Sequence, residues 1–581
     1  MKIVNFKLKI CVVLLFVVIS FIFSSPASAS SNFITDYKVI YNIEKTGQTL
    51  VNIEISLTNK TSKNFATEYQ MNLGFDDISD FKSSDVQGNI NAKLQKKENG
   101  YDAILPLNRK SVGEGKKNTF NISFLTKSIT KNNGDIWDIN IPGISNPSDY
   151  NKFEVVVKHP DSFGKPTYIK PNFGNDSLIF DKESLGKSGI SIGFGKEQNY
   201  QFDLTYHLKN PNLYPIKTKI ALPPDTGYQR VFIKDINPRP KSISIDQDGN
   251  WLAEYSLSPA QKLDITVRGN SIIQLNPKSS ELTAIENDLY TRSTKFWQTE
   301  DKNIEKLATE LKTPERIYDY VVKTLKYDFS RVSENKSRKG AVNALLPPNS
   351  AVCREYTDLF IAITRAAGIP SREINGYANT GSTKNRPLSL VKDVLHSWPE
   401  YYDVTNKSWI MVDPTWGATT GGVDYFDTLD FDHFAFVVKG ESDSYPIPAG
   451  GYKSDKERNF KDVKVIYSKS DFDQQEKLQL NAPVSNKYIA GTPININVEI
   501  TNGGPGAILP QDFHVSSNEL SPNDQISEIP LIPPGGKHIV KLRFMPTNIL
   551  TKKSALFTIR FGDKKIEQRV NIIPLFLYPW N

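Results

Sequence analysis

The chain has 581 residues, of which 38% are hydrophobic and 23% charged, as expected for a folded protein of about three to five domains. Its formal net charge of +7 is small for this length and gives no support for nucleic-acid binding. The presence of only two cysteines excludes a disulfide-rich scaffold.

The first 29 residues have the pattern of a secretory signal peptide. Lysines between Lys2 and Lys9 precede an apolar run from Ile10 to Phe23, and residues 27–29 form an A-x-A cleavage site. An uncleaved N-terminal anchor is the alternative, but the run is short for a membrane-spanning helix of ~20 residues. We therefore expect a secreted or cell-surface protein that loses Cys11 on cleavage and has no membrane-spanning segment in its mature form.

Residues 30–280 have the pattern of β-structure. Apolar and polar side chains alternate in segments such as 49–57 and 120–125, as a strand with one buried face requires. Clusters of Asn, Gly, Asp and Pro separate these segments and indicate turns. Because the region is long for one sandwich, we expect a β-sandwich domain at residues 30–160 and a β-rich domain at residues 161–280.

Residues 281–445 change to a helical pattern and then return to strands. Apolar residues recur at intervals of three and four, as in amphipathic helices, and two alternating segments follow. The expected helices cover 304–311, 314–325 and 353–367, and the expected strands cover 396–402 and 409–412. Helices followed by antiparallel strands predict an α+β domain.

The last part of the chain predicts a linker and a further sandwich. Residues 446–480 are polar, which favours a linker. Alternation resumes at 494–500, and Gly-Pro turns lie at 503–506 and 533–536, so we expect an immunoglobulin-like sandwich at residues 481–581. The expected fold is therefore multidomain, with an α+β core flanked by all-β sandwich domains.

Cys353 is the one thiol outside the expected signal peptide. A cysteine acts as a nucleophile in its thiolate form, which a helix N-terminus or an adjacent imidazole favours. The segment PPNS at 347–350 is a poor helix former, so the helix begins at or just before Cys353. The free backbone N–H groups at the start of this helix could hold an oxyanion. By itself, however, a lone cysteine at a helix start is more often a small core residue.

Among the six histidines, His396 has the most informative position. It opens a strand in which His396, Trp398 and Glu400 share one face. The following strand ends at Asp413, so a hairpin would bring this carboxylate beside His396, where it would fix the tautomer and stabilise the charged imidazole. His433 lies beyond the second strand and is expected to be a loop or core residue.

Three blocks of sequence resemble the transglutaminase-like superfamily: AVCREYTDLFIAITRAAGIPSREINGYA, HSWPEYYD and WIMVDPTWG. The resemblance covers about residues 300–420, and the upstream segment TPERIYDYVVKTLKYD is similar to bacterial members. It implies a circularly rearranged papain-like core in which Cys353 is the nucleophile, His396 the base and Asp413 the orienting acid. It also implies that Trp398 and Trp416 line a pocket. No calcium loop is evident, so calcium activation is not carried over, and no side-chain donor for an oxyanion hole is identified.

Simpler interpretations exist for each of these residues. A strand histidine is more often structural than catalytic, and Asp413 by itself is the end of a strand before a turn. For Glu400, two interpretations are equally compatible with the sequence. It supports the triad from behind, as part of a substrate pocket with Trp398 and Trp416, or it is a solvated acid on the strand. The aromatic cluster around the two tryptophans is expected to be mostly core, with one or two residues facing a cleft.

The residues and the resemblance together predict an exported thiol acyl-transfer enzyme. We expect it to act on peptide or amide bonds of proteins or cell-wall peptides without a cofactor, a metal or nucleic acid. A cross-linking transglutaminase is one alternative. A non-catalytic adhesion or scaffold protein, in which the β-rich regions bind partners, is another. The substrate and the oligomeric state are left open by the sequence.

Overall fold

The computed structural model describes residues 32–574 and Leu577, except for these positions: 99, 172–176, 187–188, 333–336, 381–386, 388–394, 421–422, 428, 453–460, 470–471 and 547–549. The signal peptide expected at residues 1–29 lies outside the described residues. In the part of the chain that is described, no helix has the length and apolarity needed to cross a membrane.

The chain divides into two compact units. Unit 1 comprises Met1–Ile129, Ile144–His159 and Ser177–Gly186, and unit 2 comprises Thr130–Gly143, Pro160–Asp176 and Lys187–Asn581. This division is coarser than the segments expected from the sequence, whose individual boundaries remain predictions.

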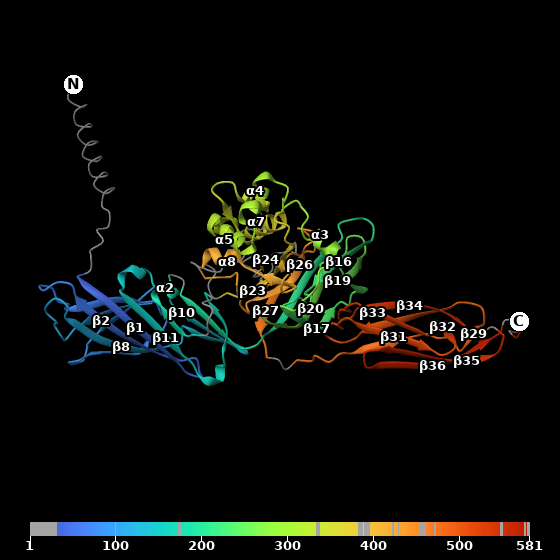
Figure 1. The fold of residues 1–581 in the computed structure, drawn as a ribbon, viewed down its shortest axis with the longest axis horizontal. Helices are drawn as coiled ribbons and strands as arrows, with labels where there is room; N and C mark the ends of the chain where they lie inside the picture. The colour runs from blue at the N-terminus through green and yellow to red at the C-terminus, as the bar shows by residue number, and fades with distance from the viewer. Residues whose placement is uncertain are drawn as a thin grey trace, which may run out of the picture. The chain divides into compact units, whose positions relative to one another are not determined.

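Unit 1 consists of two sheets and short helical turns (Figure 1). The larger sheet has the strand order β13 (Ile179–Asp181), β11 (Lys152–Lys158), β1 (Phe33–Ile43), β2 (Thr49–Asn59), β8 (Lys117–Thr126), β4 (Ser79–Asp85), β5 (Gly88–Asn89). The smaller sheet has the order β3 (Glu68–Leu73), β7 (Gly100–Pro106), β6 (Lys93–Lys97), and the short helix α2 spans Lys182–Leu185.

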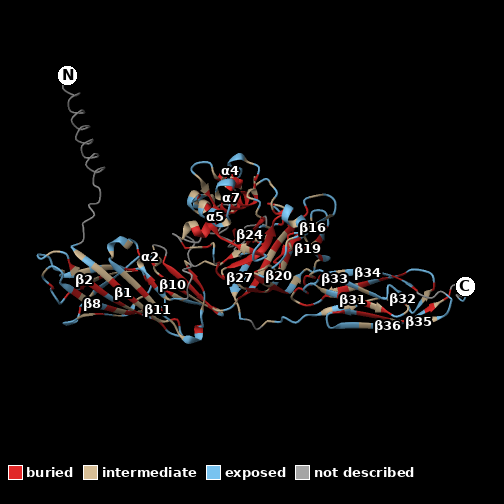
Figure 2. Cartoon of the chain, in the orientation of Figure 1, coloured by how far each residue is buried: buried red, intermediate tan, exposed pale blue. Residues whose placement is uncertain are grey.

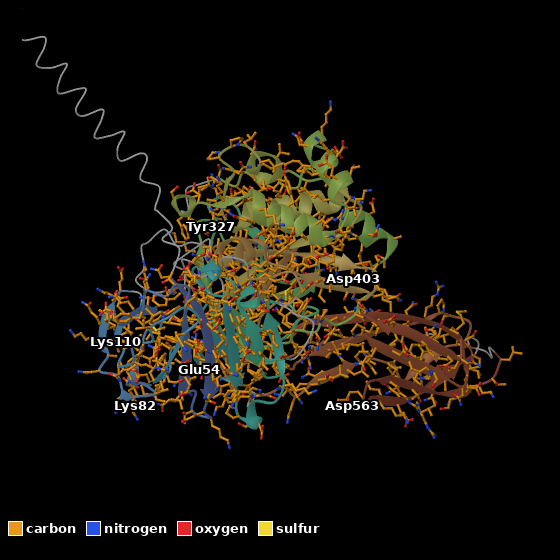
Figure 3. All side chains as sticks on the ribbon, turned by 60° about the vertical axis from the view of Figure 1, so that its left-hand side comes forward. Glu54, Lys82, Lys110, Tyr327, Asp403 and Asp563 are labelled. Atoms are coloured by element: carbon orange, nitrogen blue, oxygen red, sulfur yellow. The ribbon has the colours of Figure 1, made fainter. Side chains whose placement is uncertain are left out.

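The larger sheet of unit 1 has one apolar and one polar face. In β2, Val51, Ile53 and Ile55 are buried, as the alternating sequence predicts. The opposite face carries a hollow of about 650 Å³ with polar side chains that include Glu54 and Lys82 (Figure 3).

Unit 2 begins with three antiparallel sheets. Their strand orders are β12 (Pro166–Lys170), β14 (Ile190–Phe194), β10 (Ile136–Ile141), β9 (Thr130–Asn133); β17 (Gln229–Asn237), β20 (Lys262–Ile273), β15 (Gln198–Lys209), β27 (Val463–Tyr467); and β16 (Ile216–Leu222), β19 (Trp251–Leu257), β18 (Ser242–Ile245). Because β27 pairs with β15, the segment predicted as a linker at 446–480 is not an unstructured connection throughout.

The α+β core of unit 2 places helices against one antiparallel sheet (Figure 1). The sheet order is β25 (Ser408–Met411), β24 (Leu395–Asp403), β23 (Ser371–Ala378), β26 (His433–Lys439), and a short parallel pair joins β21 (Lys326–Tyr327) to β22 (Ser350–Ala351). The helices are α3 (Ala284–Leu289), α4 (Lys302–Leu311), α5 (Pro314–Thr324), α6 (Gly340–Ala344), α7 (Cys353–Ala366) and α8 (Pro414–Thr419).

Helix α7 is buried along almost its whole length (Figure 2). Its fully buried charged side chains are therefore hydrogen-bonded, because an isolated buried charge is costly. Asp358 accepts hydrogen bonds from the Arg338 guanidinium and from Nε1 of Trp297, and Arg365 donates to the carbonyl oxygens of Ser371 and Gly440. These pairs fix the helix against the sheet and hold its first residue in place.

The C-terminal part of unit 2 contains two sheets that share one hydrophobic core. Their orders are β28 (Leu478–Asn481), β30 (Ile494–Asn502), β34 (Lys537–Pro546), β32 (Leu520–Ser521); and β29 (Lys487–Ile489), β36 (Lys564–Ile573), β35 (Lys553–Phe561), β31 (Gln511–Ser517), β33 (Asp524–Ile529). The structure thus shows the expected α+β core within a chain that is otherwise rich in β-sheets. The immunoglobulin-like character of the flanking regions stays a prediction.

Candidate active site

Cys353 is the first residue of α7 and is fully buried. Val352 precedes it in an extended conformation, and its N–H donates to Oε2 of Glu355 at 2.9 Å. This hydrogen bond satisfies a backbone donor at the helix start, where a Ser or Thr cap is absent. The N–H groups of Cys353 and Arg354 have no acceptor among the described residues. They are therefore available to an anion next to the thiol.

His396 lies on β24, directly opposite Gly376 of β23. A Cβ atom at Gly376 would lie 2.1 Å from the carbonyl oxygen of Phe434 on β26, so only glycine fits this position. The close packing brings β24 and β26 to either side of β23. As a result, His396 and His433, which stand near the same end of these strands, approach each other to 5.8 Å between ring centroids.

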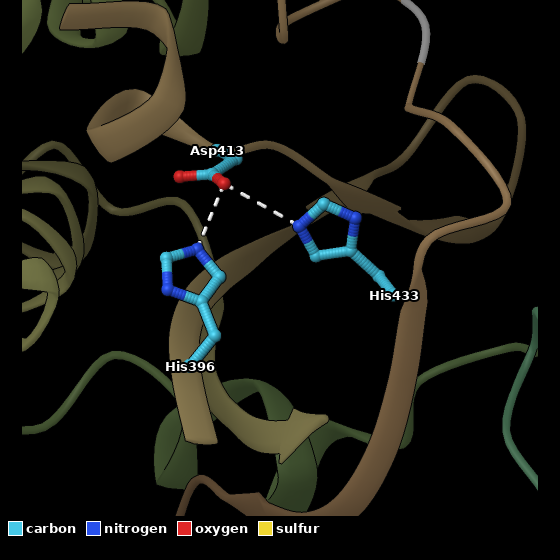
Figure 4. Close-up of side chains that lie close together, drawn as sticks. All are labelled: His396, Asp413 and His433. Carbon is cyan, nitrogen blue, oxygen red and sulfur yellow. Dashed lines mark hydrogen bonds and ion pairs between the residues drawn. The ribbon is translucent and has the colours of Figure 1, made fainter. Parts of the chain in front are cut away.

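Asp413 follows β25 and is the N-cap residue of α8. Its Oδ1 accepts hydrogen bonds from the backbone N–H groups of Thr415 at 2.9 Å and Trp416 at 3.1 Å. Its Oδ2 faces Nε2 of His396 at 2.8 Å and Nε2 of His433 at 3.3 Å (Figure 4). The hairpin formed by β24 and β25 therefore brings Asp413 beside His396, as the sequence pattern predicts, and four donors fix the carboxylate.

The electrostatics favour a charged pair of His396 and Asp413. Burial by itself would lower the pKa of His396, but the charge and hydrogen bond of Asp413, with a smaller contribution from Cys353, raise it to about 10. Burial would likewise raise the pKa of Asp413, but His396 and His433 together hold it well below its usual range. An imidazolium is thus the stable form of His396 at neutral pH.

The second ring nitrogen of His396, Nδ1, has no hydrogen-bond partner although it is buried. Cys353 lies close enough that its charge and a hydrogen bond to the ring both raise the pKa of His396, although the contact with Nδ1 does not reach ordinary hydrogen-bond geometry. A buried and unpartnered nitrogen is costly, and such groups in native structures are often kept for chemistry. The arrangement leaves Nδ1 free to exchange a proton with a group that enters beside the thiol.

The two predicted pocket tryptophans enclose the His396 ring. Trp416 stacks on it with ring centroids 5.1 Å apart and an interplanar angle of 20°, and Trp398 lies 5.9 Å away at 27°. Both tryptophans are 0% exposed. Their indole N–H groups donate to the carbonyl oxygen of Pro387 and to Sδ of Met411, respectively. They restrict the rotation of His396 and exclude water from it, whereas their contact with a substrate stays a prediction.

Residues 298–414 match the family model of the Transglutaminase-like superfamily. This segment carries a transglutaminase-like core. It contains Cys353, His396 and Asp413, and it ends before His433.

Other comparisons extend beyond this transglutaminase-like core. The uncharacterised protein YebA of Bacillus subtilis is 22% identical over 254 residues, which are 39% of this chain and 33% of that protein. The chain therefore matches one third of the relative's length. A solved structure from Cytophaga hutchinsonii, provisionally assigned as a cysteine protease, is 16% identical over 47% of this chain and 98% of that chain, with a TM-score of 0.28. The periplasmic domain of TgpA from Pseudomonas aeruginosa is 14% identical over 39% and 92%, with a TM-score of 0.22.

Glu400, the third predicted pocket residue, is 1% exposed and is not a solvated strand acid. Its Oε2 accepts a hydrogen bond from Nε of Arg372 at 2.8 Å, and the Arg372 guanidinium lies 3.9 Å from the ring centroid of Trp409. Glu400 thus belongs to a buried ion pair with Arg372 rather than to the hydrogen bonds of the triad.

His433 is a site residue that the sequence pattern did not identify. It is the first residue of β26, and its Nδ1 lies 2.9 Å from Oδ1 of Asp430 while its Nε2 faces Asp413. Burial would lower the pKa of His433, but the charge of Asp430 and hydrogen bonds to both carboxylates raise it. Because β26 is buried on both faces, its sequence has no alternation that would indicate the side on which His433 lies.

Tyr327 is a second site residue missed by sequence reasoning (Figure 3). Parallel pairing of β21 with β22 places it beside Ala351, two residues before Cys353. Its hydroxyl oxygen is buried and has no hydrogen-bond partner among the described residues. Burial and then the charge of Cys353 raise its pKa well above the usual range, so the hydroxyl keeps its proton. Tyr327 is therefore a candidate for the missing side-chain donor of an oxyanion hole.

His396, Asp413 and His433 also offer three ligand atoms within 4.8 Å of one another. Two imidazoles and a carboxylate are suitable zinc ligands. However, both imidazole Nε2 atoms already face the same carboxylate oxygen at hydrogen-bonding distance. The donor set is explained by these hydrogen bonds, and we assign no metal to it.

Proposed function

We propose that this protein is an exported thiol-dependent enzyme that hydrolyses peptide or amide bonds through Cys353, His396 and Asp413. The observation that supports this proposal most strongly is the state of the buried His396 ring. One ring nitrogen is bonded to Asp413, and the other is unpartnered beside the only thiol among the described residues. An imidazole held in this way suits proton transfer to and from a substrate bound at the thiol.

In the proposed acylation step, the Cys353 thiolate attacks the carbonyl carbon of the substrate and the carbonyl electron pair moves onto oxygen. The free N–H groups at the start of α7 and the Tyr327 hydroxyl would donate to this oxyanion. The C–N bond then breaks as His396 gives its Nδ1 proton to the leaving nitrogen. Asp413 stays ionised throughout and holds the imidazole in orientation.

The deacylation step decides the class of reaction. Water would give a carboxylic acid after neutral His396 accepts a proton from it, and a primary amine would give a cross-link. We favour water because an exported enzyme meets water at a far higher concentration than any amine. Mass spectrometry of candidate proteins and cell-wall peptides after incubation tests this. New termini or released ammonia support hydrolysis, and covalent incorporation of a labelled amine supports the cross-linking alternative.

Export and surface location form part of the same proposal. The basic start, apolar run and A-x-A site support cleavage after residue 29, and the β-rich flanks are suited to act as spacers or binding modules. A mature protein whose first residue is Ser30 is the expected result of terminal sequencing. If Cys353→Ser leaves every cellular phenotype unchanged, the non-catalytic scaffold interpretation is favoured instead.

A further inference from the structure

A line of buried charged groups continues from the triad on the side away from Cys353. His433 joins Asp413 to Asp430, at 3.3 Å from Oδ2 of Asp413 and 2.9 Å from Oδ1 of Asp430. The other oxygen of Asp430, Oδ2, lies 3.4 Å from Nζ of Lys170. All four side chains are at most 2% exposed. They therefore interact in a medium where charges are poorly screened.

The geometry requires a proton on both nitrogens of His433. An ionised carboxylate only accepts hydrogen bonds, and each ring nitrogen of His433 faces a carboxylate oxygen. A neutral imidazole would present a lone pair to one of them. With both carboxylates ionised, His433 is an imidazolium, and the direction in which its pKa is shifted agrees with this.

Lys170 enters this network from outside the transglutaminase-like core. It ends β12 and lies 260 residues before Asp430 in the sequence. Its Nζ lies 3.9 Å from the ring centroid of Tyr425 and 5.3 Å from that of Tyr168, so the ammonium is held between two rings and a carboxylate. Burying a lysine ammonium is costly unless its partners compensate for the lost hydration, and the carboxylate and the two rings do so here.

Along the line of groups, the charges alternate in sign. Lys170, His433 and His396 are positive and Asp430 and Asp413 are negative, while Asp138 and Asp432 add negative charge around Tyr168, on which Lys170 packs. Each of Asp430 and Asp413 thus lies between two positive groups, and a thiolate at Cys353 would continue the alternation beyond His396.

We propose that His433, Asp430 and Lys170 extend the triad into a single buried chain of alternating charges that stabilises the Cys353 thiolate at its end. In this chain His433 and Lys170 are positioning residues: they act through Asp413 and Asp430 and do not touch the substrate. The catalytic unit therefore includes β12, and the matched segment alone is incomplete. This inference rests on the proposed thiol chemistry.

The experiment compares Lys170→Met, which removes the charge and keeps the length, with Lys170→Arg, which keeps the charge. Both are made in the protein from residue 30 onward, which contains all described residues. The thiolate is followed by its ultraviolet absorbance between about pH 4 and 9, as the difference from a matched Cys353→Ser protein. This readout needs no reagent access to the buried thiol. Thermal unfolding of each variant checks that it is folded.

Several groups face the residues that these variants perturb. His433 is faced by Asp413, Asp430, His396 and the rings of Trp398 and Trp416. Lys170 is faced by Asp430 and the rings of Tyr168 and Tyr425, and the charges of Asp138 and Asp432 also act on Tyr168. None of these groups is changed in either variant, so a difference between Met and Arg reports the charge at position 170.

Lys170→Met should raise the pH at which the thiolate becomes protonated. At a pH where the wild type retains only a small fraction of thiolate, we expect that fraction to fall about tenfold in Lys170→Met. Lys170→Arg should restore the wild-type titration. His433→Gln, which removes the charge and offers an amide oxygen in place of one ring N–H, should move the titration in the same direction as Lys170→Met. A folded Lys170→Met protein with the wild-type titration would overturn the inference and leave the proposed function intact. A wild-type protein with no thiolate at neutral pH would overturn both.

Discussion

Replacement of Asp413 by asparagine removes the charge that stabilises the His396 imidazolium and nearly keeps the shape of the side chain. The pKa of His396 rises from 6.5 to about 10 in the folded protein. This difference corresponds to about 5 kcal/mol, at about 1.36 kcal/mol per unit. Burial alone lowers the pKa of a histidine. Without the charge of Asp413, the pKa of His396 should therefore fall to 6.5 or below, and the neutral ring should dominate at neutral pH.

NMR of ¹⁵N-labelled histidine side chains, titrated between about pH 5 and 10, measures this change directly. The signal is assigned by its loss in His396→Ala. In the wild type, His396 should stay doubly protonated through neutral pH, and in Asp413→Asn it should titrate at or below its ordinary value. The amide oxygen of asparagine can still accept from the N–H groups of Thr415 and Trp416, so the variant should fold. A folded Asp413→Asn protein in which His396 remains charged at pH 9 would refute the assignment of Asp413.

Three further predictions follow from buried groups of the site. Tyr327→Phe should lower the rate of acylation about 10²- to 10³-fold, as loss of one oxyanion donor does. The midpoint of thermal unfolding should not fall. An unchanged rate of acylation would show that Tyr327 is not part of the oxyanion hole. Glu355→Ala should cost about 3–5 kcal/mol in urea unfolding because it leaves the N–H groups of Val352 and Lys339 without their acceptor and removes the carboxylate partner of Arg331. Glu355→Gln, which keeps an acceptor, should cost less. Equal losses in the two Glu355 variants would contradict this explanation. Because the pKa of His396 is raised on folding, the charged His396 stabilises the folded protein fully below pH 6.5, and this stabilisation is lost as the pH rises through about 10. The free energies of unfolding of the wild type and Asp413→Asn should therefore differ more at pH 6 than at pH 10. A difference that is the same at both pH values would contradict this prediction.

The parts of the site that the sequence predicts are those determined by local structure. The poor helix-forming segment before Cys353 sets the start of α7, and Glu355, two residues later, satisfies the backbone there. Alternation in β24 and the short turn after it determine the hairpin that brings Asp413 to His396. Both features depend on residues that are neighbours in the chain, where periodicity and turn signals are informative.

The remaining parts depend on contacts between distant residues. His433 reaches Asp413 only because β26 pairs with β23, and Lys170 reaches Asp430 across 260 residues. No local pattern specifies such pairings. For the same reason β27, a short strand in a polar segment, was expected to be linker, although it completes a sheet with β15. The sequence does not identify Tyr327, because a tyrosine near a helix end has the same pattern as an ordinary core residue. Its role is suggested only by the structure, in which its buried hydroxyl has no hydrogen-bond partner among the described residues.

The most direct test of a working thiol site is the ionisation of Cys353 in the protein from residue 30 onward, compared with His396→Ala. Thiolate absorbance and the rate of alkylation by iodoacetamide are measured from about pH 5 to 9, with unfolded protein as the control for reagent access. We predict a thiolate that persists below pH 6 in the wild type and is lost in His396→Ala. A thiol that titrates near the free value of about 8.5 in both proteins would contradict the ion pair and favour a non-catalytic scaffold.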